Sequence, residues 1–229
     1  MEYPSEEFKS FIVLPHTFSA IRVFDEKDLG AHLTATNITL KFSCTPTDET
    51  ADASAKAMIG YQRLRTWLDA VMQNIIIIDV NSPMIGDMHN DVTNLMMYAP
   101  GRTDDALLSI LFHSKASAIT DGLLDIHSIW MVSTDTENTE RYYKNSDGDY
   151  GLPGIEYFNE RKLSDGTLSS NKRPWWSRST VDICEYAQED GKDVVWFEID
   201  PLLDIGKDYL TDTTEADIIV FDAWKRKDE

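Results

Sequence analysis

Lysine, arginine and tryptophan come together in one short segment, KRPWWSR at residues 172–178, whose side-chain types could bind a nucleic acid. Basic and aromatic residues are the types that grip the backbone and the bases of a single strand. This segment is nevertheless a single short cluster in a chain with a formal net charge of -19. We therefore expect a packed loop or a contact between subunits, and no nucleic-acid partner.

Other reactive side chains lie far apart along the chain. The cysteines, Cys44 and Cys184, have none of the spacings typical of a metal site. A reduced compartment is the simplest interpretation, and one disulfide is the alternative. The sequence also contains no P-loop, GxSxG, HExxH or dinucleotide-binding motif. Motifs alone thus indicate no catalytic centre.

Composition predicts a folded, acidic, cytoplasmic protein. The chain has 229 residues, of which 42% are hydrophobic, enough for a sizeable core. Its acidity disfavours anionic membranes and nucleic acids as partners, because both attract lysine and arginine clusters. The apolar run at residues 75–78 is far shorter than the roughly 20 residues that cross a bilayer. The first ten residues are acidic where a secretory signal is basic, so we expect no membrane or export segment.

Apolar spacing predicts strands followed by a helix in the first third of the chain. A short apolar run at residues 11–14 is expected to end at Pro15, and strands at 18–24 and 33–42 could form an antiparallel pair. A helix capped by Asp48 or Thr50 is expected next. Its buried face would consist of residues spaced by three and four, namely Met58, Tyr61, Leu64, Leu68, Val71 and Met72. The isoleucines at 75–78 indicate a buried extended segment.

A second helix is expected to begin at Thr103, a good N-cap, with Asp104 and Asp105 at its positive end. A strand at residues 123–132 should follow it. Residues 144–173 are polar and rich in turn formers, and two more strands are expected at 194–199 and 218–221.

This order of elements and several local sequences resemble the T-fold family of 6-pyruvoyl- and 6-carboxy-tetrahydropterin synthases over residues 16–145. FSAIR at 18–22 is similar to the family's FSAAH, and LTATN at 33–37 to its LHGHN. Weaker similarities are MIGYQRLR at 58–65 to MVxDFxxLK, IDV at 78–80 to LDH, TDDA at 103–106 to TxEN, and DT at 135–136 to ET. The resemblance implies an α+β fold: a T-fold-like antiparallel sheet with two helices on one face, formed by residues 1–145. Residues 146–229 would be a C-terminal extension packed on this domain.

The family's metal ligands are missing. Three histidines hold zinc in the family, and the corresponding positions here are Arg22, Thr34 and Thr36. A protonated guanidinium cannot bind zinc, and threonine hydroxyls are poor ligands. His16 and His32 lie nearby in the sequence, but two imidazoles make an incomplete site and we expect them at the surface or in loops. The resemblance therefore implies neither a metal nor another cofactor.

The family's catalytic residues are missing as well. The loop that holds its catalytic cysteine contains Leu29 and no thiol, and its catalytic histidine corresponds to Val80. Loss of metal, nucleophile and base together predicts that the synthase activity is absent.

The resemblance still implies a site for a small ligand. A family carboxylate after the last strand binds the amidine edge of the pterin, with help from the start of the second helix. Asp135, Thr136, Thr103 and Asp104 are therefore the expected contacts for a pterin- or purine-like ligand, because a carboxylate accepts two parallel N–H bonds. The alternative is that Thr103 only caps a helix and Asp135 only forms a turn.

Three functions follow from these observations. The first is a metal-free, non-catalytic T-fold protein that forms a homo-oligomer and keeps either the ligand pocket or only the assembly. The alternative is an acidic interaction protein that inhibits or sequesters a basic or DNA-binding protein. An enzyme with a relocated site is the third, and it has the least support in the sequence.

Overall fold

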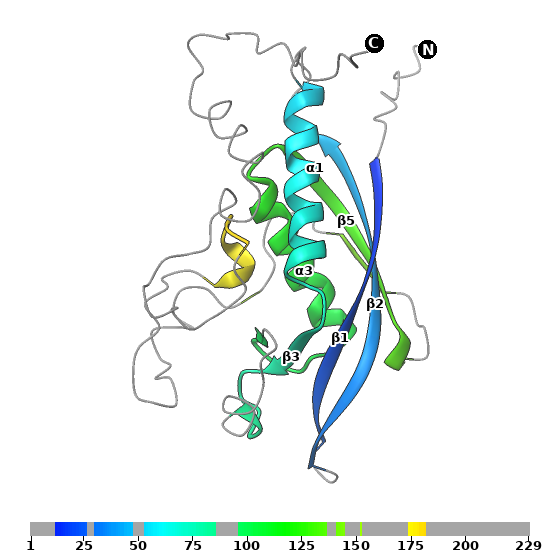
Figure 1. Ribbon diagram of the computed structural model, residues 1–229, viewed down its shortest axis with the longest axis vertical. Coiled ribbons are helices and arrows are strands. Elements are labelled where there is room, and N and C mark those ends of the chain that lie inside the picture. The colour runs from blue at the N-terminus through cyan, green and yellow to red at the C-terminus, as the bar shows by residue number, and fades with distance from the viewer. Residues whose placement is uncertain are drawn as a thin grey trace, which may run out of the picture.

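The computed structural model describes residues 12–26, 30–47, 53–85, 96–136, 141–144, 152 and 174–181 (Figure 1). Predicted strands at 194–199 and 218–221 lie outside these residues, as do the expected caps Asp48 and Thr50. The strands are β1 (Ile12–Glu26), β2 (Gly30–Pro46), β3 (Ile75–Asp79), β4 (Met96–Ala99), β5 (Leu124–Ser133) and β6 (Arg141–Lys144). The helices are α1 (Ala53–Ala70) and α3 (Asp105–Thr120), with short 3-10 turns η1 (Thr134–Thr136) and η2 (Trp175–Ser177).

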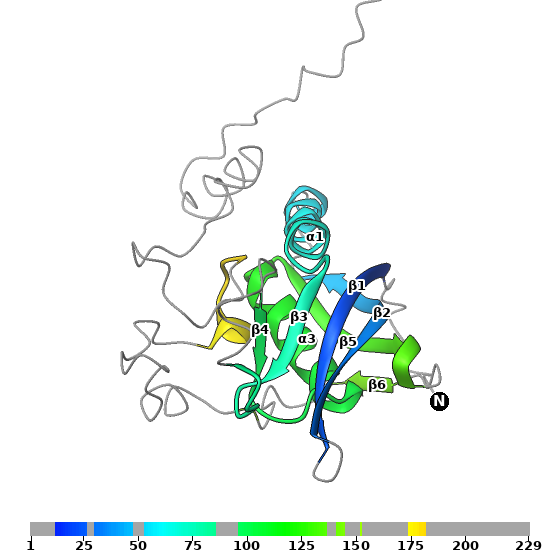
Figure 2. The same ribbon diagram turned by 60° about the horizontal axis from the view of Figure 1, so that its bottom comes forward.

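The strands form one mixed sheet in the order β4-β3-β1-β2-β5-β6. The pairs β1–β2, β2–β5 and β5–β6 are antiparallel, whereas β3 runs parallel to both β1 and β4, so the sheet is not antiparallel throughout as the resemblance implied. Both helices pack on the same face, and Figure 2 shows α3 against the sheet with α1 beside it. The α+β class and the two helices on one face are thus confirmed in this coarse form.

The main core lies between the helices and the sheet. Alternate residues of β1 and β2, including Phe18, Ala20, Ile38 and Leu40, point into it. The ring of Phe112 on α3 makes edge contacts with the rings of Phe18 and Trp67. A smaller apolar cluster on the opposite face contains Val23, Ile76, Ile78, Met96 and Tyr98. The sheet is therefore apolar on both faces where β1, β3 and β4 meet.

Pro15 does not end a strand, contrary to the expectation from the sequence. β1 runs without interruption from Ile12 to Glu26, and Pro15 lies opposite Lys41 of β2. The carbonyl of Ser19 faces β3, because it accepts a hydrogen bond from the backbone N–H of Asn74. Along a strand, the backbone N–H and C=O groups of residues two apart point to the same side, so those of Pro15 also point to the β3 side. β3 pairs only with residues 20–22 there and does not reach Pro15. Its missing N–H therefore costs no bond to β2.

The start of the second helix also differs from the expectation. The N-cap of α3 is Asp104, whose Oδ1 accepts a hydrogen bond from the N–H of Leu107 at 2.8 Å, and not Thr103. Thr103 is buried and its hydroxyl donates to the carbonyl of Val23 at 2.9 Å.

The buried extended segment expected at 75–78 is confirmed as β3, whereas strands β4 and β6 were not expected from the sequence.

The aromatic cluster at residues 174–178 packs into the core. Trp175 and Trp176 are 0% and 2% exposed. Lys115 of α3, itself 0% exposed, donates from Nζ to the carbonyls of Trp175, Arg178 and Thr180 at 2.9, 3.1 and 2.7 Å. The indole N–H of Trp175 donates to the carbonyl of Tyr98 at the edge of β4. Residues 174–178 of the basic–aromatic segment are therefore packed, whereas Lys172 and Arg173 lie outside the described residues.

Within the described residues, neither helix is long and apolar enough to span a bilayer.

Candidate functional site

The most unusual buried residue of the described chain is Arg22 of β1, which is 0% exposed. It follows Phe18 and Ala20 at the two-residue spacing of a strand, so its side chain points to the helix-covered face. A guanidinium remains protonated inside a protein. Burial of this charge requires anionic or strongly polar neighbours.

Two carboxylates supply the opposite charge. Nη2 of Arg22 lies 2.5 Å from Oδ1 of Asp105, in the first turn of α3, and Nη1 lies 3.5 Å from Oδ1 of Asp135 in η1. Nη2 also donates to Oγ of Ser133 at 2.6 Å, and Ser133 Oγ donates to Asp105 Oδ1 at 2.8 Å. Arg22 thus joins β1, the start of α3 and the end of β5.

Threonines extend this network along β2. Thr36 Oγ1 donates to Asp135 Oδ1 at 2.9 Å and lies 3.4 Å from the hydroxyl of Thr134. The hydroxyl of Thr134 accepts a bond from the backbone N–H of Asn37 at 2.9 Å. We call Arg22, Thr36, Asp105, Ser133 and Asp135 the arginine cluster. With two carboxylates and one guanidinium, it carries a formal charge of one negative unit.

Some polar atoms of the arginine cluster have no hydrogen-bond partner among the described residues. They are Nε and Nη1 of Arg22 and Oδ2 of Asp135, all buried. Buried donors and acceptors without protein partners are commonly satisfied by water or by a ligand. The cluster therefore retains hydrogen-bonding capacity on both its cation and one of its anions.

The expected ligand contacts lie around this cluster in different roles. Asp135 belongs to it directly, and its side chain is 3% exposed. Thr103 and Asp104 immediately precede Asp105, but one bonds to β1 and the other caps α3. Thr136 ends η1, and its side chain lies outside the described residues. Sequence reasoning identified Arg22 only as a lost zinc ligand, and it missed Ser133 and the inward orientation of Asp105.

Among the described residues, no three histidine, cysteine, aspartate or glutamate side chains are grouped to hold a metal ion. His16 and His32 lie in β1 and β2 rather than in loops. His16 is half-buried, with Nδ1 3.6 Å from Oδ1 of Asp69, and burial lowers its pKa despite that carboxylate. His32 is exposed and stacks on Phe24.

Other residues singled out for chemistry have structural roles. Burial raises the pKa of the Cys44 thiol to about 11, which keeps it protonated and poorly nucleophilic near neutral pH. Asp79 accepts a hydrogen bond from the backbone N–H of Asn81 at 2.8 Å, beyond the end of β3. Val80 packs against the smaller apolar cluster, and Leu29 lies outside the described residues.

Comparison with known proteins adds no assignment: no protein-family model matches this chain, and no curated protein matches it significantly. The arginine cluster must therefore be interpreted from its own geometry.

Proposed function

We propose that this chain is a metal-free, non-catalytic T-fold protein in which Arg22 supplies the positive charge that a metal supplies in the synthases it resembles. The observation that carries the proposal is the fully buried guanidinium of Arg22 between Asp105 and Asp135. A divalent cation placed beside it would meet strong repulsion in a medium that screens charge poorly.

Strand register supports the comparison with the family. Arg22 lies directly opposite Thr34, and Thr36 lies two residues further along β2, opposite Ala20. The three positions that correspond to zinc ligands therefore share one face of the β1–β2 pair, as a metal site would require. The antiparallel run β1-β2-β5-β6 with two helices on one face agrees with the same comparison.

A pterin- or purine-like ligand is part of the proposal, with Asp135 as its carboxylate. Arg22 already approaches Oδ1, and a guanidinium has the same N–C–N arrangement as the ligand edge it would compete with. Oδ2 has no partner among the described residues and is the atom that remains for a ligand.

Assembly into a homo-oligomer is the second part of the proposal, because β6 ends the sheet as an edge strand within the described chain.

Restoring the metal site is the sharpest test. The variant Arg22→His/Thr34→His/Thr36→His should bind one zinc ion per chain, whereas the wild type should bind none in the same dialysis against zinc. Arg22→His alone is the matched control, because it offers zinc one imidazole and two aspartates in place of the three imidazoles of the triple variant. A folded triple variant with no more zinc than this control would argue against the T-fold comparison.

Ligand and assembly are tested separately. Calorimetry with neopterin and guanosine should show binding to the wild type that Asp135→Ala removes. If neither molecule binds, the ligand part fails and only the assembly remains. Light scattering coupled to gel filtration should show a homo-oligomer, and a monomer at all concentrations would contradict the second part.

A further inference from the structure

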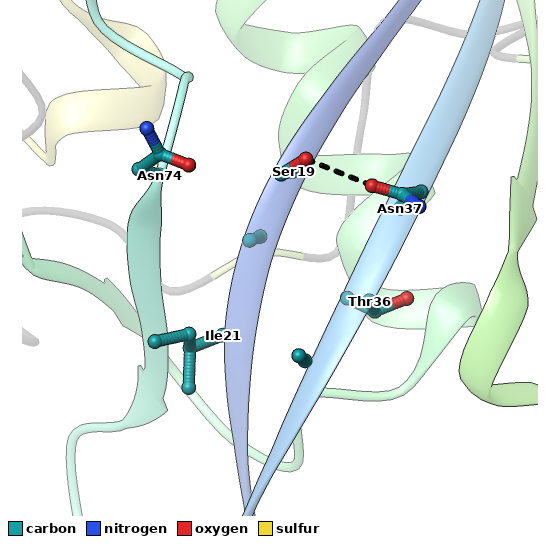
Figure 3. Close-up of a pocket in the computed structure, with 7 residues that line it drawn as sticks. Ser19, Ile21, Thr36, Asn37 and Asn74 are labelled. Atoms are coloured by element: carbon teal, nitrogen blue, oxygen red, sulfur yellow. Dashed lines mark hydrogen bonds between the residues drawn. The ribbon is translucent and has the colours of Figure 1, made fainter.

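A hollow of about 480 Å³ lies on the face of the sheet opposite the helices (Figure 3). It lies over the neighbouring strands β1 and β2, with Asn74, the residue before β3, at its side. Ser19, Ile21, Ala35 and Asn37 line it, and they alternate along their strands with Ala20 and Thr36, which also border the hollow. The side chains of Ser19, Ile21, Ala35 and Asn37 thus point away from the helix-covered face that holds the guanidinium of Arg22, and Thr36 is the one residue of the arginine cluster that borders the hollow.

The polar groups of the hollow are uncharged. Ser19 Oγ donates to Asn37 Oδ1 at 2.8 Å, which leaves the amide nitrogen of Asn37 as a donor for a ligand. Asn74, just before β3, brings a second carboxamide to the opposite side, and Figure 3 shows its side chain facing β1. None of the described residues that line the hollow carries a charge.

Asn74 is held in an unusual conformation at this place. Its φ of 60° lies in the left-handed region, which residues other than glycine seldom adopt. Its backbone N–H donates to the carbonyl of Ser19 at 2.8 Å, which fixes the start of β3 against β1. The carboxamide is therefore presented from a rigid position beside the strand that carries Ser19.

Apolar surface completes the hollow. Ile21 is half-buried and Ala35 is exposed, and their short or compact side chains leave room for a flat body. The volume falls within the range of small-molecule sites, and apolar lining with a few convergent polar groups is their usual composition.

We propose that this hollow binds a small uncharged molecule that carries neighbouring N–H and C=O groups on a flat body, the chemistry of a cyclic amide such as uracil. A carboxamide pairs with such an edge through two parallel hydrogen bonds, as asparagine does with a nucleobase. Anions are disfavoured by the net charge of -19, and the hollow has no described carboxylate to attract a cation. This site does not depend on the function proposed for the arginine cluster.

The test uses uridine as the probe and amide chemical shifts of the full chain as the readout. Uridine should shift the signals of Ser19, Ala35 and Asn37. Asn74→Gly removes the carboxamide while glycine keeps the left-handed backbone, so it should weaken binding by at least about tenfold, the value of roughly one of the two lost hydrogen bonds. Gln73→Ala, which removes the adjacent carboxamide that does not line the hollow, should bind as the wild type does.

Three outcomes would overturn the proposal. Absence of any shift up to the solubility limit of uridine would exclude the ligand class. Equal binding by Asn74→Gly and the wild type would exclude the location. Glucose is an uncharged molecule without an amide edge, and binding as tight as that of uridine would exclude the cyclic amide.

Discussion

Arg22 and Asp105 form an ion pair in which Nη2 and Oδ1 lie 2.5 Å apart and the side chains are 0% and 2% exposed. A pair this deeply buried has lost its hydration, so each charge depends on the other for stabilisation. The pair also ties the middle of β1 to the first turn of α3, where the helix dipole favours the carboxylate. Removal of either partner should therefore affect folding rather than only the surface charge.

Arg22→Met should lower the free energy of unfolding by about 3–5 kcal/mol, because it leaves two buried carboxylates without their cation. Urea denaturation at neutral pH measures this change. Arg65→Met is the matched control: Arg65 also pairs with an aspartate, Asp69, but its side chain is 66% exposed. That variant should change stability by less than about 1 kcal/mol. Similar losses in the two variants would show that the buried pair has no special weight.

Arg22→Ala should create a binding site for free guanidinium. The variant removes the side chain but keeps the oxygen atoms of Asp105, Asp135 and Ser133, which contact the native guanidinium. It also keeps Thr36, which holds Asp135 by a hydrogen bond. Guanidinium chloride at low millimolar concentration should raise the melting temperature of Arg22→Ala and leave that of the wild type unchanged. Sodium chloride at the same ionic strength is the control for screening. No difference between the two salts would indicate that the cavity collapses in the variant.

Regular periodicity explains which parts of the fold the sequence could predict. Alternation in residues 33–42 and the spacing from Met58 to Met72 each specify a local element, so β2, α1 and β3 were expected. The inclusion of Met58 in the buried face of α1 was wrong, because Met58 is 54% exposed and Ala57 and Trp67 are buried instead. The continuity of β1 through Pro15 could not be expected, because it depends on which side of the strand β3 covers. β4 has only four residues, too few for a periodic signal.

The candidate site was predicted only in part, for a related reason. Asp104 and Asp105 are adjacent, and which of them caps α3 and which points inward depends on the residue at which the helix begins. The partners Arg22 and Ser133 are 111 positions apart, so no local pattern joins them. Arg22 follows Phe18 and Ala20 at the two-residue spacing of one strand face, and this spacing was the one signal in the sequence from which the cluster could have been suspected.

Lys115→Met should detach the segment at residues 174–181 from α3. The thioether side chain has a similar length but no donor, so the carbonyls of Trp175, Arg178 and Thr180 lose their charged partner. We expect a loss of about 2–4 kcal/mol in the free energy of unfolding, given the strength of hydrogen bonds to charged groups. Trypsin should cleave the variant after Arg178, which is 6% exposed in the native chain. Lys41→Met is the surface control, and equal cleavage in both variants would contradict this role of Lys115.

His113 should make the protein less stable as the solution becomes acidic. Its side chain on α3 is 2% exposed, and burial lowers its pKa from the ordinary value of 6.5, in spite of nearby groups that raise it. The unfolded chain therefore takes up a proton before the folded chain does, so the stabilisation is complete above pH 6.5 and is lost as the pH falls toward the lowered pKa.

Urea denaturation between about pH 7.5 and pH 5 measures this loss, because that interval stays above the range in which carboxylates titrate. His113→Gln should reduce this dependence, while the residual slope reflects His16, whose pKa is lowered in the same direction. His32→Gln, at an exposed position, should retain the wild-type slope, and a flat wild-type profile would rule out the burial of a neutral histidine.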